Sequence, residues 1–206
     1  LTKNMTAIGD HVFTNCKGLE EIVIPENITS IAAYAFENCE ALKSITIPSG
    51  VTAIKEYTFS GCTSLAEVNL PDGLELIKDH AFLNCKALTY IDLPDSITEL
   101  YRDAFRDCTA LAEIGYPAGL VTVTTNSYYR SPFYGCSALK RITVDAGVTV
   151  IPDNTFRGMT KLEEIVLPES LSSIGAYAFE NCTGLKKINL TKNMTAIGDH
   201  VFTNCK

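Results

Sequence analysis

The sequence has no excess of positive charge. Its 206 residues include 17 Lys and Arg against 24 Asp and Glu, which gives a formal net charge of −7. A nucleic-acid-binding domain needs a basic face to neutralise phosphates, and electrostatic adhesion to an anionic membrane needs a basic cluster. The charge balance therefore predicts that the partner is neither a nucleic acid nor a membrane surface.

Long apolar runs are also missing. No stretch approaches the roughly 20 apolar residues that a membrane-spanning helix requires, so we expect no direct membrane insertion. A basic and then apolar leader is not found at the start either, but Leu1 falls partway through a repeat. The expectation from this start is an interior part of a longer array.

Sequence patterns of common catalytic sites are absent as well. We find no nucleophile elbow, phosphate-binding loop or zinc-protease helix. Adjacent carboxylates such as Glu20 and Glu21 point to opposite sides of an extended chain. His80 and Cys85 resemble a pair of metal ligands, but no third and fourth ligand accompany them. We therefore expect no enzyme activity, no catalytic residue, no cofactor and no metal site.

What the sequence does contain is a repeat. All nine phenylalanines are 23 residues apart, except for one step of 28 residues: Phe13, Phe36, Phe59, Phe82, Phe105, Phe133, Phe156, Phe179 and Phe202. Every cysteine follows one of these phenylalanines by three residues, and only Met159 replaces a cysteine in the series. A fixed period of this length is typical of a solenoid, in which each coil packs on its neighbours.

One repeat unit predicts the architecture of a coil. In Leu42–Ile47, apolar residues alternate with Ser44 and Thr46, which is typical of a half-buried strand. A short extended stretch follows, and the segment around Phe and Cys is expected to make one helical turn. The predicted strands are 19–24, 42–47, 65–70, 88–93, 111–116, 139–144, 162–167 and 185–190.

These elements predict an α/β solenoid that forms one domain over residues 1–206. We expect a right-handed coil of about nine 23-residue repeats, partial at both ends, with a five-residue insertion within 124–132. A parallel β-sheet covers one face, and short extended or helical turns cover the other. The eight cysteines are expected to be free, buried thiols, because equivalent side chains of stacked coils lie parallel and Met159 is accepted among them.

The pattern L-x-x-I-x-[IL]-P-x-x-[IL]-x-x-I-x-x-x-A-F-x-x-C resembles the BspA-like leucine-rich repeats, also called the Treponema pallidum type. The resemblance covers the whole chain, and prolines such as Pro48 and Pro71 take the place of the asparagine of ordinary leucine-rich repeats. It implies a leucine-rich-repeat solenoid from a bacterial cell-surface or secreted protein. Some members of this family adhere to host matrix and plasma proteins, so it also implies an extracellular or host surface protein as partner.

Tyrosine and arginine gather around the insertion. Both residue types are enriched in interface hot spots, and insertions in a solenoid form surface loops. The candidate partner-binding residues are Tyr90, Tyr101, Arg102, Tyr128, Tyr129, Arg130 and Tyr134. Tyr116, in an inward strand position, is expected to belong to the core.

The outward strand positions are a second candidate surface. They vary in size and charge from repeat to repeat, whereas the inward positions hardly change. We expect a non-enzymatic protein-interaction or adhesion module. The alternative is a structural spacer, a stiff rod that presents other domains and has no ligand of its own.

The two ends of the chain are identical. LTKNMTAIGDHVFTNCK occupies residues 1–17 and again residues 190–206. Both copies keep their apolar repeat residues, whereas terminal capping repeats usually carry a polar outer face. We expect both ends of the array to expose apolar surface, and either to fray or to associate end to end.

Overall fold

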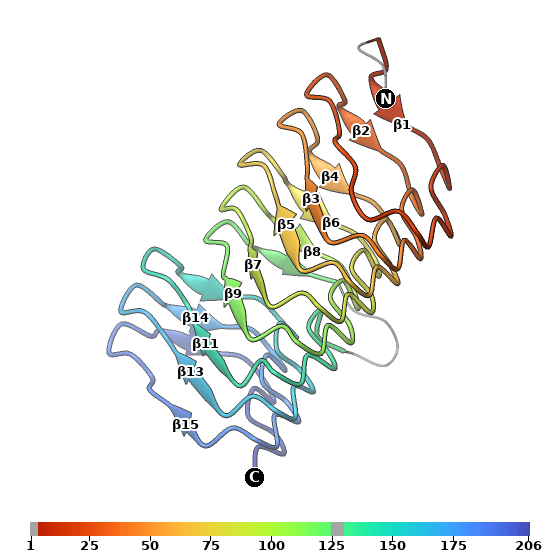
Figure 1. Ribbon diagram of the computed structural model, residues 1–206. Coiled ribbons are helices and arrows are strands. Elements are labelled where there is room, and N and C mark those ends of the chain that lie inside the picture. The colour runs from red at the N-terminus through yellow and green to blue at the C-terminus, as the bar shows by residue number, and fades with distance from the viewer. Residues whose placement is uncertain (1–3, 125–129) are drawn as a thin grey trace.

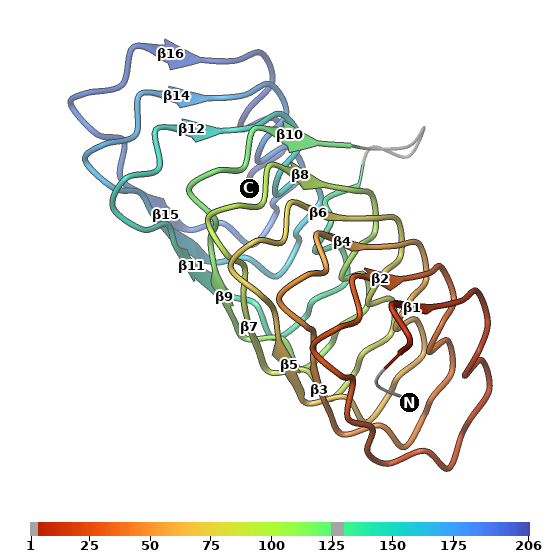
Figure 2. The same cartoon turned by 90° about the horizontal axis from the view of Figure 1, so that it is seen from above.

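The apolar alternation of each repeat produces a stack of similar coils. The computed structural model describes residues 4–124 and 130–206. Successive coils stack along one axis, and strands β1 (Ala7–Ile8) and β16 (Ala196–Ile197) lie at opposite ends of the rod (Figures 1 and 2). The predicted solenoid with parallel strands is confirmed.

One side of the rod carries strands with a buried central residue and two outward neighbours, and we call it the front row. In β7, Ile91 is buried between the exposed side chains of Tyr90 and Asp92. The front row consists of β3 (Ser44–Thr46), β5 (Glu67–Asn69), β7 (Tyr90–Asp92), β9 (Glu113–Gly115), β11 (Arg141–Thr143), β13 (Glu164–Val166) and β15 (Lys187–Ile188). The predicted strand over 19–24 is not formed, although Lys43 N–H donates to the carbonyl of Glu20.

A second row of strands runs along an adjacent side of the rod, and we call it the side row. The sequence predicted only extended segments here, but these segments pair in parallel, for example Ala53 with Leu76. The side row consists of β1, β2 (Ser30–Ile31), β4 (Ala53–Ile54), β6 (Leu76–Ile77), β8 (Glu99–Leu100), β10 (Thr122–Val123), β12 (Val150–Ile151), β14 (Ser173–Ile174) and β16.

The segment around each repeat phenylalanine closes the coil, and we call this side the turn row. The predicted helical turn is wrong, since the described residues contain no helix. Around Phe36, short-range bonds run from Glu37 N–H to Tyr34 O and from Cys39 N–H to Phe36 O. The N–H groups of Phe36 and Asn38 instead donate to the next coil, at 2.9 and 2.7 Å. The turn row is therefore a third ladder between coils.

The backbone conformation explains why no helix forms in the described chain. The residue two positions after each phenylalanine has positive φ, and so has the residue two positions before it except at Ser131, for example Asn38 at 57° and Tyr34 at 59°. A helix needs consecutive right-handed residues, so these two positions limit the turn to a few residues. The later position is occupied only by residue types that tolerate this conformation: Asn15, Asn38, Gly61, Asn84, Asp107, Gly135, Gly158, Asn181 and Asn204.

Phenylalanine and cysteine columns fill the core beside the turn row. Neighbouring rings are stacked, with centroids 5.0 Å apart for Phe13 and Phe36 and 5.1 Å apart for Phe82 and Phe105. Each of seven thiols donates to the carbonyl of the phenylalanine one coil earlier, as in Cys62 Sγ to Phe36 O at 3.1 Å. A thiol fits this column because it combines apolar bulk with one weak donor.

The insertion divides the side row without interrupting the core. Strands β4, β6, β8 and β10 form one ladder, and β12, β14 and β16 form another. The ring stack continues past this point, since Phe105 and Phe133 lie 5.4 Å apart. Tyr116 is buried and packs against Phe156 at 6.0 Å, so its predicted place in the core is confirmed.

Candidate functional site

The outward positions of the front row form two columns of side chains. Strand pairing aligns Tyr90 with Glu113 and Asp92 with Gly115. On the preceding pair of strands, Glu67 and Asn69 occupy the equivalent positions. Because every front-row strand has the same register, these side chains point away from the core on one face.

Tyr90 is the aromatic side chain among the outward positions of the described front-row strands. It is 47% exposed, and the equivalent residues of the preceding and following coils, Glu67 and Glu113, are carboxylates. Partial burial, and then the nearby carboxylate of Asp92, raise the pKa of the Tyr90 hydroxyl. The hydroxyl therefore stays protonated at neutral pH and can donate a hydrogen bond, while the ring offers apolar contact area.

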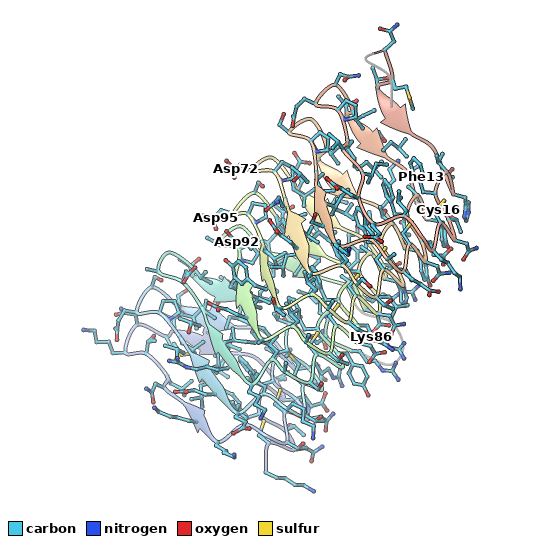
Figure 3. The ribbon with its side chains drawn as sticks, viewed as in Figure 1. Phe13, Cys16, Asp72, Lys86, Asp92 and Asp95 are labelled. Carbon is cyan, nitrogen blue, oxygen red and sulfur yellow. The ribbon has the colours of Figure 1, made fainter. Side chains whose placement is uncertain are left out.

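Six carboxylates lie in β5, β7 and β9 or in the segments that follow β5, β7 and β11, and we call them the acidic face: Glu67, Asp72, Asp92, Asp95, Glu113 and Asp145. Asp72, Asp92 and Asp95 lie along one flank of the front row (Figure 3). Within residues 4–124 and 130–206, none of the six forms an ion pair with a Lys, Arg or His. By contrast, Glu164 contacts both Arg141, at 3.1 Å, and Lys187, at 3.3 Å. Arg141 lines the hollow beside Glu113 but pairs with Glu164, so the acidic face keeps a net negative charge.

Two hollows flank Tyr90, where the front row is not joined by a ladder. Strands β7 and β9 pair with each other, and in the described chain neither pairs with β5 or β11. A hollow of about 670 Å³ lies against β5 and β7, and another of about 500 Å³ lies against β9 and β11. Gly115 shapes the second hollow, because a Cβ at this position would lie 2.0 Å from Asp92 Oδ1. The Asp92 carboxylate thus occupies the space above the glycine.

The other predicted binding residues lie apart from Tyr90. Tyr101, just after β8 of the side row, donates its hydroxyl to Glu99 at 2.7 Å, and Lys78 Nζ lies 3.7 Å from its ring centroid. Arg102 contacts Asp79 at 3.2 Å. Arg130 lies over the ring of Tyr134 at 4.6 Å, and Tyr128 and Tyr129 fall outside the described residues. The described members of the predicted set therefore do not share one surface, since Tyr90 lies on the front row and Tyr101 follows β8 of the side row.

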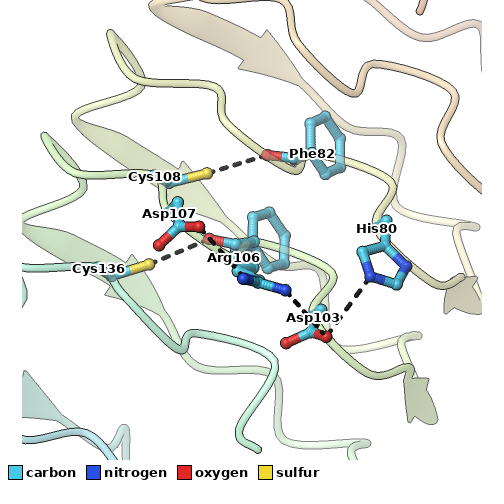
Figure 4. A network of polar contacts seen from close by, with 8 residues as sticks. His80, Phe82, Asp103, Arg106, Asp107, Cys108 and Cys136 are labelled. Atoms are coloured by element: carbon cyan, nitrogen blue, oxygen red, sulfur yellow. Dashed lines mark hydrogen bonds and ion pairs between the residues drawn. The ribbon is translucent and has the colours of Figure 1, made fainter.

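A buried polar network, which the sequence did not reveal, lies in the turn row (Figure 4). Asp103 takes the position that holds a tyrosine or histidine in most repeats, and it is buried. Its Oδ2 lies 3.5 Å from His80 Nε2 and 3.9 Å from Arg106 Nη1, and Arg106 Nε lies 3.2 Å from Asp107. Burial lowers the pKa of His80, while Asp103 acts in the opposite direction.

This network has the chemistry of a structural contact. The thiols drawn beside it in Figure 4 are those of Cys108 and Cys136, which donate to the carbonyls of Phe82 and Phe105 at 3.1 and 3.2 Å. A thiol bonded in this way, inside the core, is not presented as a nucleophile. The same network ends the stack of outer rings, since His80 packs against Tyr57 on one side and meets Asp103 on the other.

Neither a metal centre nor a membrane span is found in the described chain. Residues 4–124 and 130–206 hold no group of three or more His, Cys, Asp or Glu placed to share a metal ion. The same residues include no helix with the length and apolarity needed to cross a membrane.

Comparison with known sequences decides the family. The profile of the BspA type leucine-rich repeat region matches six times, over residues 1–112 and 88–206. The chain belongs to the BspA-type leucine-rich repeat family. No curated protein matches it in sequence.

Solved structures of other leucine-rich repeat proteins share this BspA-type fold. A protein from Bacteroides ovatus is 32% identical with a TM-score of 0.75, over 96% of this chain and 51% of its own length. The Treponema pallidum leucine-rich repeat protein is 29% identical with a TM-score of 0.67, over 90% and 86%. A protein from Eubacterium ventriosum is 25% identical with a TM-score of 0.65, over 99% and 63%. The chain thus spans about half the length of the first of these relatives.

Proposed function

We propose that this BspA-type repeat array is a non-enzymatic protein-binding module, and that the acidic face around Tyr90 is its contact surface. The observation that carries the proposal is a front-row surface with an exposed tyrosine and six carboxylates, none of which has an ion pair within the described residues. A cell-surface or secreted location is part of the proposal, and the family resemblance supports it.

The arrangement favours a partner with a basic, extended segment. Lysine and arginine side chains of such a segment can approach the carboxylates of Asp92 and Glu113, while Tyr90 supplies apolar contact and one hydrogen-bond donor. The hollows that flank Tyr90 offer space for side chains of the partner. Tyrosine at the centre of a polar rim is a common arrangement of interface hot spots.

The other predicted residues are a second proposed contact region. Its described members, Tyr101, Arg102, Arg130 and Tyr134, belong to the side and turn rows, and Tyr128 and Tyr129 lie outside the described residues. Tyr101 and Arg102 are already held by Glu99 and Asp79. Ordered side chains of this kind lose less conformational freedom when a partner binds.

The test measures binding of the chain to immobilised extracellular matrix and plasma proteins. For a protein that binds, we expect Tyr90→Ala to weaken binding at least about tenfold, as for a central hot spot. Asp92→Asn with Glu113→Gln should reduce both the association rate and its dependence on salt. Glu163→Gln is the matched control, because Glu163 is also a carboxylate, directly before β13, but it already forms an ion pair with Lys186 at 2.7 Å.

A stiff spacer is the second candidate function. The continuous stack of repeat phenylalanines and the three ladders of each coil support it, because they resist bending of the rod. Binding that is unchanged by Tyr90→Ala and by the carboxylate variants contradicts the acidic face as contact surface. A chain that binds none of the tested proteins favours the spacer.

A further inference from the structure

The column of repeat cysteines is interrupted at one coil, where Met159 takes the place of the cysteine. Elsewhere the thiol donates to the carbonyl of the phenylalanine one coil earlier, as Cys182 Sγ does to Phe156 O at 3.1 Å. A thioether sulfur has no hydrogen to donate. In the described chain, Phe133 O therefore accepts the N–H of Cys136 at 3.1 Å but receives no thiol bond. This carbonyl keeps one acceptor position unused on the side of Met159.

The ring stack widens at the same coil. The centroids of Phe133 and Phe156 lie 6.4 Å apart, whereas the other successive repeat phenylalanines lie 5.0–5.7 Å apart. The position two residues after the phenylalanine is glycine in both of these coils, Gly135 and Gly158, and in no other pair of neighbouring coils. Elsewhere an asparagine such as Asn38 fills this position with a side chain that reaches the preceding coil. The wider spacing and the two glycines leave space between the two coils.

This space is a hollow of about 270 Å³, which we call the turn-row pocket. Phe133, Cys136, Met159 and Leu162 line its base, and each of them is at most 4% exposed. Lys161 also lines the pocket, is exposed, and forms no ion pair within residues 4–124 and 130–206. The turn-row pocket is therefore apolar at its base and positively charged at its rim.

A second charged residue lines the turn-row pocket, but its charge is already compensated. Asp107 Oδ2 lies 3.2 Å from Arg106 Nε (Figure 4). Its Oδ1 lies above Gly135, where a Cβ would approach this oxygen to 2.2 Å. Of the two charged lining residues, Lys161 is thus the one without an ion pair in the described chain, and it favours an anionic group in a ligand.

We propose that the turn-row pocket binds a small aromatic carboxylate that carries a hydroxyl group on its ring. The ring packs against Phe133, Met159 and Leu162, since a thioether sulfur makes favourable contacts with aromatic rings. The ring hydroxyl donates to Phe133 O in place of the missing thiol, and the carboxylate pairs with Lys161. A cavity of about 150 Å³ holds benzene, so the turn-row pocket has room for one ring with its substituents. The site is separate from the acidic face, which lies on the front row.

The test uses para-hydroxyphenylacetate as the probe and the methionine methyl signals as the readout. The full chain has three methionines, so labelling of their methyl carbons gives three signals in a nuclear magnetic resonance spectrum. A bound aromatic ring should shift the signal of Met159, with half-saturation on the order of 1 mM, as for other ligands of this size. The methyl groups of Met5 and Met194 lie outside the turn-row pocket and are internal controls that should not move.

Three variants test which groups hold the probe. Gly158→Asn introduces the residue found in the next coil, at a position where a Cβ would meet only the Tyr134 ring, at 3.7 Å, and where asparagine tolerates the positive φ. The new side chain occupies the pocket and should weaken binding at least about tenfold. Lys161→Gln should weaken it about threefold, as for an exposed ion pair. Lys86→Gln is the matched control, because Lys86 is also exposed and lies outside the pocket, and it should leave binding unchanged.

Two related probes separate the polar contacts. Phenylacetate lacks the hydroxyl and should bind more weakly, whereas para-hydroxyphenylethanol lacks the charge and should bind equally well to the parent chain and to Lys161→Gln. The proposal is overturned if the Met159 signal stays in place up to about 20 mM probe, well above the expected half-saturation, or if all three methyl signals move together. Unchanged binding in Gly158→Asn, equal loss for both hydroxylated probes in Lys161→Gln, or equal affinity for phenylacetate also overturns it.

Discussion

Residues 4–17 and 193–206 have the same sequence but different surroundings. Val12 is 53% exposed, whereas the equivalent Val201 is 3% exposed; the order is reversed for Ile8 and Ile197, at 1% and 47%. The side chain of the valine therefore faces the preceding coil, and the side chain of the isoleucine faces the following coil. The comparison shows that a coil has two distinct sides, each of which is buried only by its own neighbour.

The same directionality governs the polar contacts. The thiol of Cys205 donates to the carbonyl of Phe179, one coil earlier, and the carbonyl of Phe13 accepts from Cys39, one coil later. A cysteine thus points to the preceding coil, and a phenylalanine carbonyl points to the following coil. Stability in such an array is approximately a sum of coil and nearest-neighbour terms, so end coils keep about half of the neighbour terms.

The largest expected effect separates the middle of the array from its ends. Phe82 is fully buried between the rings of Phe59 and Phe105, at 5.3 and 5.1 Å, so Phe82→Ala should cost about 3–5 kcal/mol of unfolding free energy. Phe202 has one ring neighbour, Phe179 at 5.7 Å, and Phe202→Ala should cost roughly half as much. Chemical denaturation measures both values.

Equal costs at Phe82 and Phe202 contradict the nearest-neighbour account. A cost below about 1 kcal/mol at Phe82 contradicts a ring stack that stabilises the core. Phe13→Ala is the matched control at the other end, because Phe13 also has a single ring neighbour, Phe36 at 5.0 Å.

A smaller effect tests the two sides of the repeated segment directly. Val201→Ala removes buried carbon atoms and should cost about 1–2 kcal/mol, at roughly 0.8 kcal/mol for each buried methylene-sized group. Val12→Ala changes the same residue in the same sequence, but at an exposed position, and should cost less than about 0.5 kcal/mol. Chemical denaturation of both variants gives the difference between their losses of unfolding free energy. Equal losses would contradict the conclusion that burial by a neighbouring coil decides the cost of the substitution.

Much of the fold could be predicted from the spacing of the repeat. The position of Phe and Cys in the core and the outward side chains of the front row follow from period and alternation. The predicted helical turn was wrong because two left-handed residues interrupt it. The sequence did indicate one of these positions, since an Asn, Asp or Gly stands two residues after each Phe. The strand over 19–24 was wrong, and no strand precedes it in the front row of the described chain.

Less of the candidate site could be predicted. Alternation correctly placed Tyr90 on the outer surface, but closeness in sequence suggested that Tyr90 and Tyr101 share a surface. The two residues belong to the same coil, but Tyr90 lies in β7 of the front row and Tyr101 follows β8 of the side row. The net negative charge of the acidic face depends on side-chain positions in neighbouring coils, which a single repeat does not reveal. Asp103 in the network of Figure 4 could have been noticed as the acidic member of a Tyr and His column.

The smallest expected effect concerns the thiols. The prediction that all eight are buried is wrong for the cysteine at each end of the array. All eight cysteines are free, and six are buried, but Cys16 and Cys205 are only half buried. Burial raises the pKa of Cys182 to about 12, and burial also raises the pKa of Cys205. Thiolate is the reactive form, so a thiol reagent at neutral pH should modify Cys16 first and Cys205 more slowly. The six remaining cysteines should react only after denaturation, for a total of eight equivalents.

Because the two end segments give identical peptides, a Cys16→Ser variant assigns the fast phase, which should disappear while the slower phase of Cys205 remains. Equal rates for the two end cysteines contradict the assignment of the thiol to the side of the preceding coil, since only Cys205 has such a coil to cover it and a carbonyl to bind.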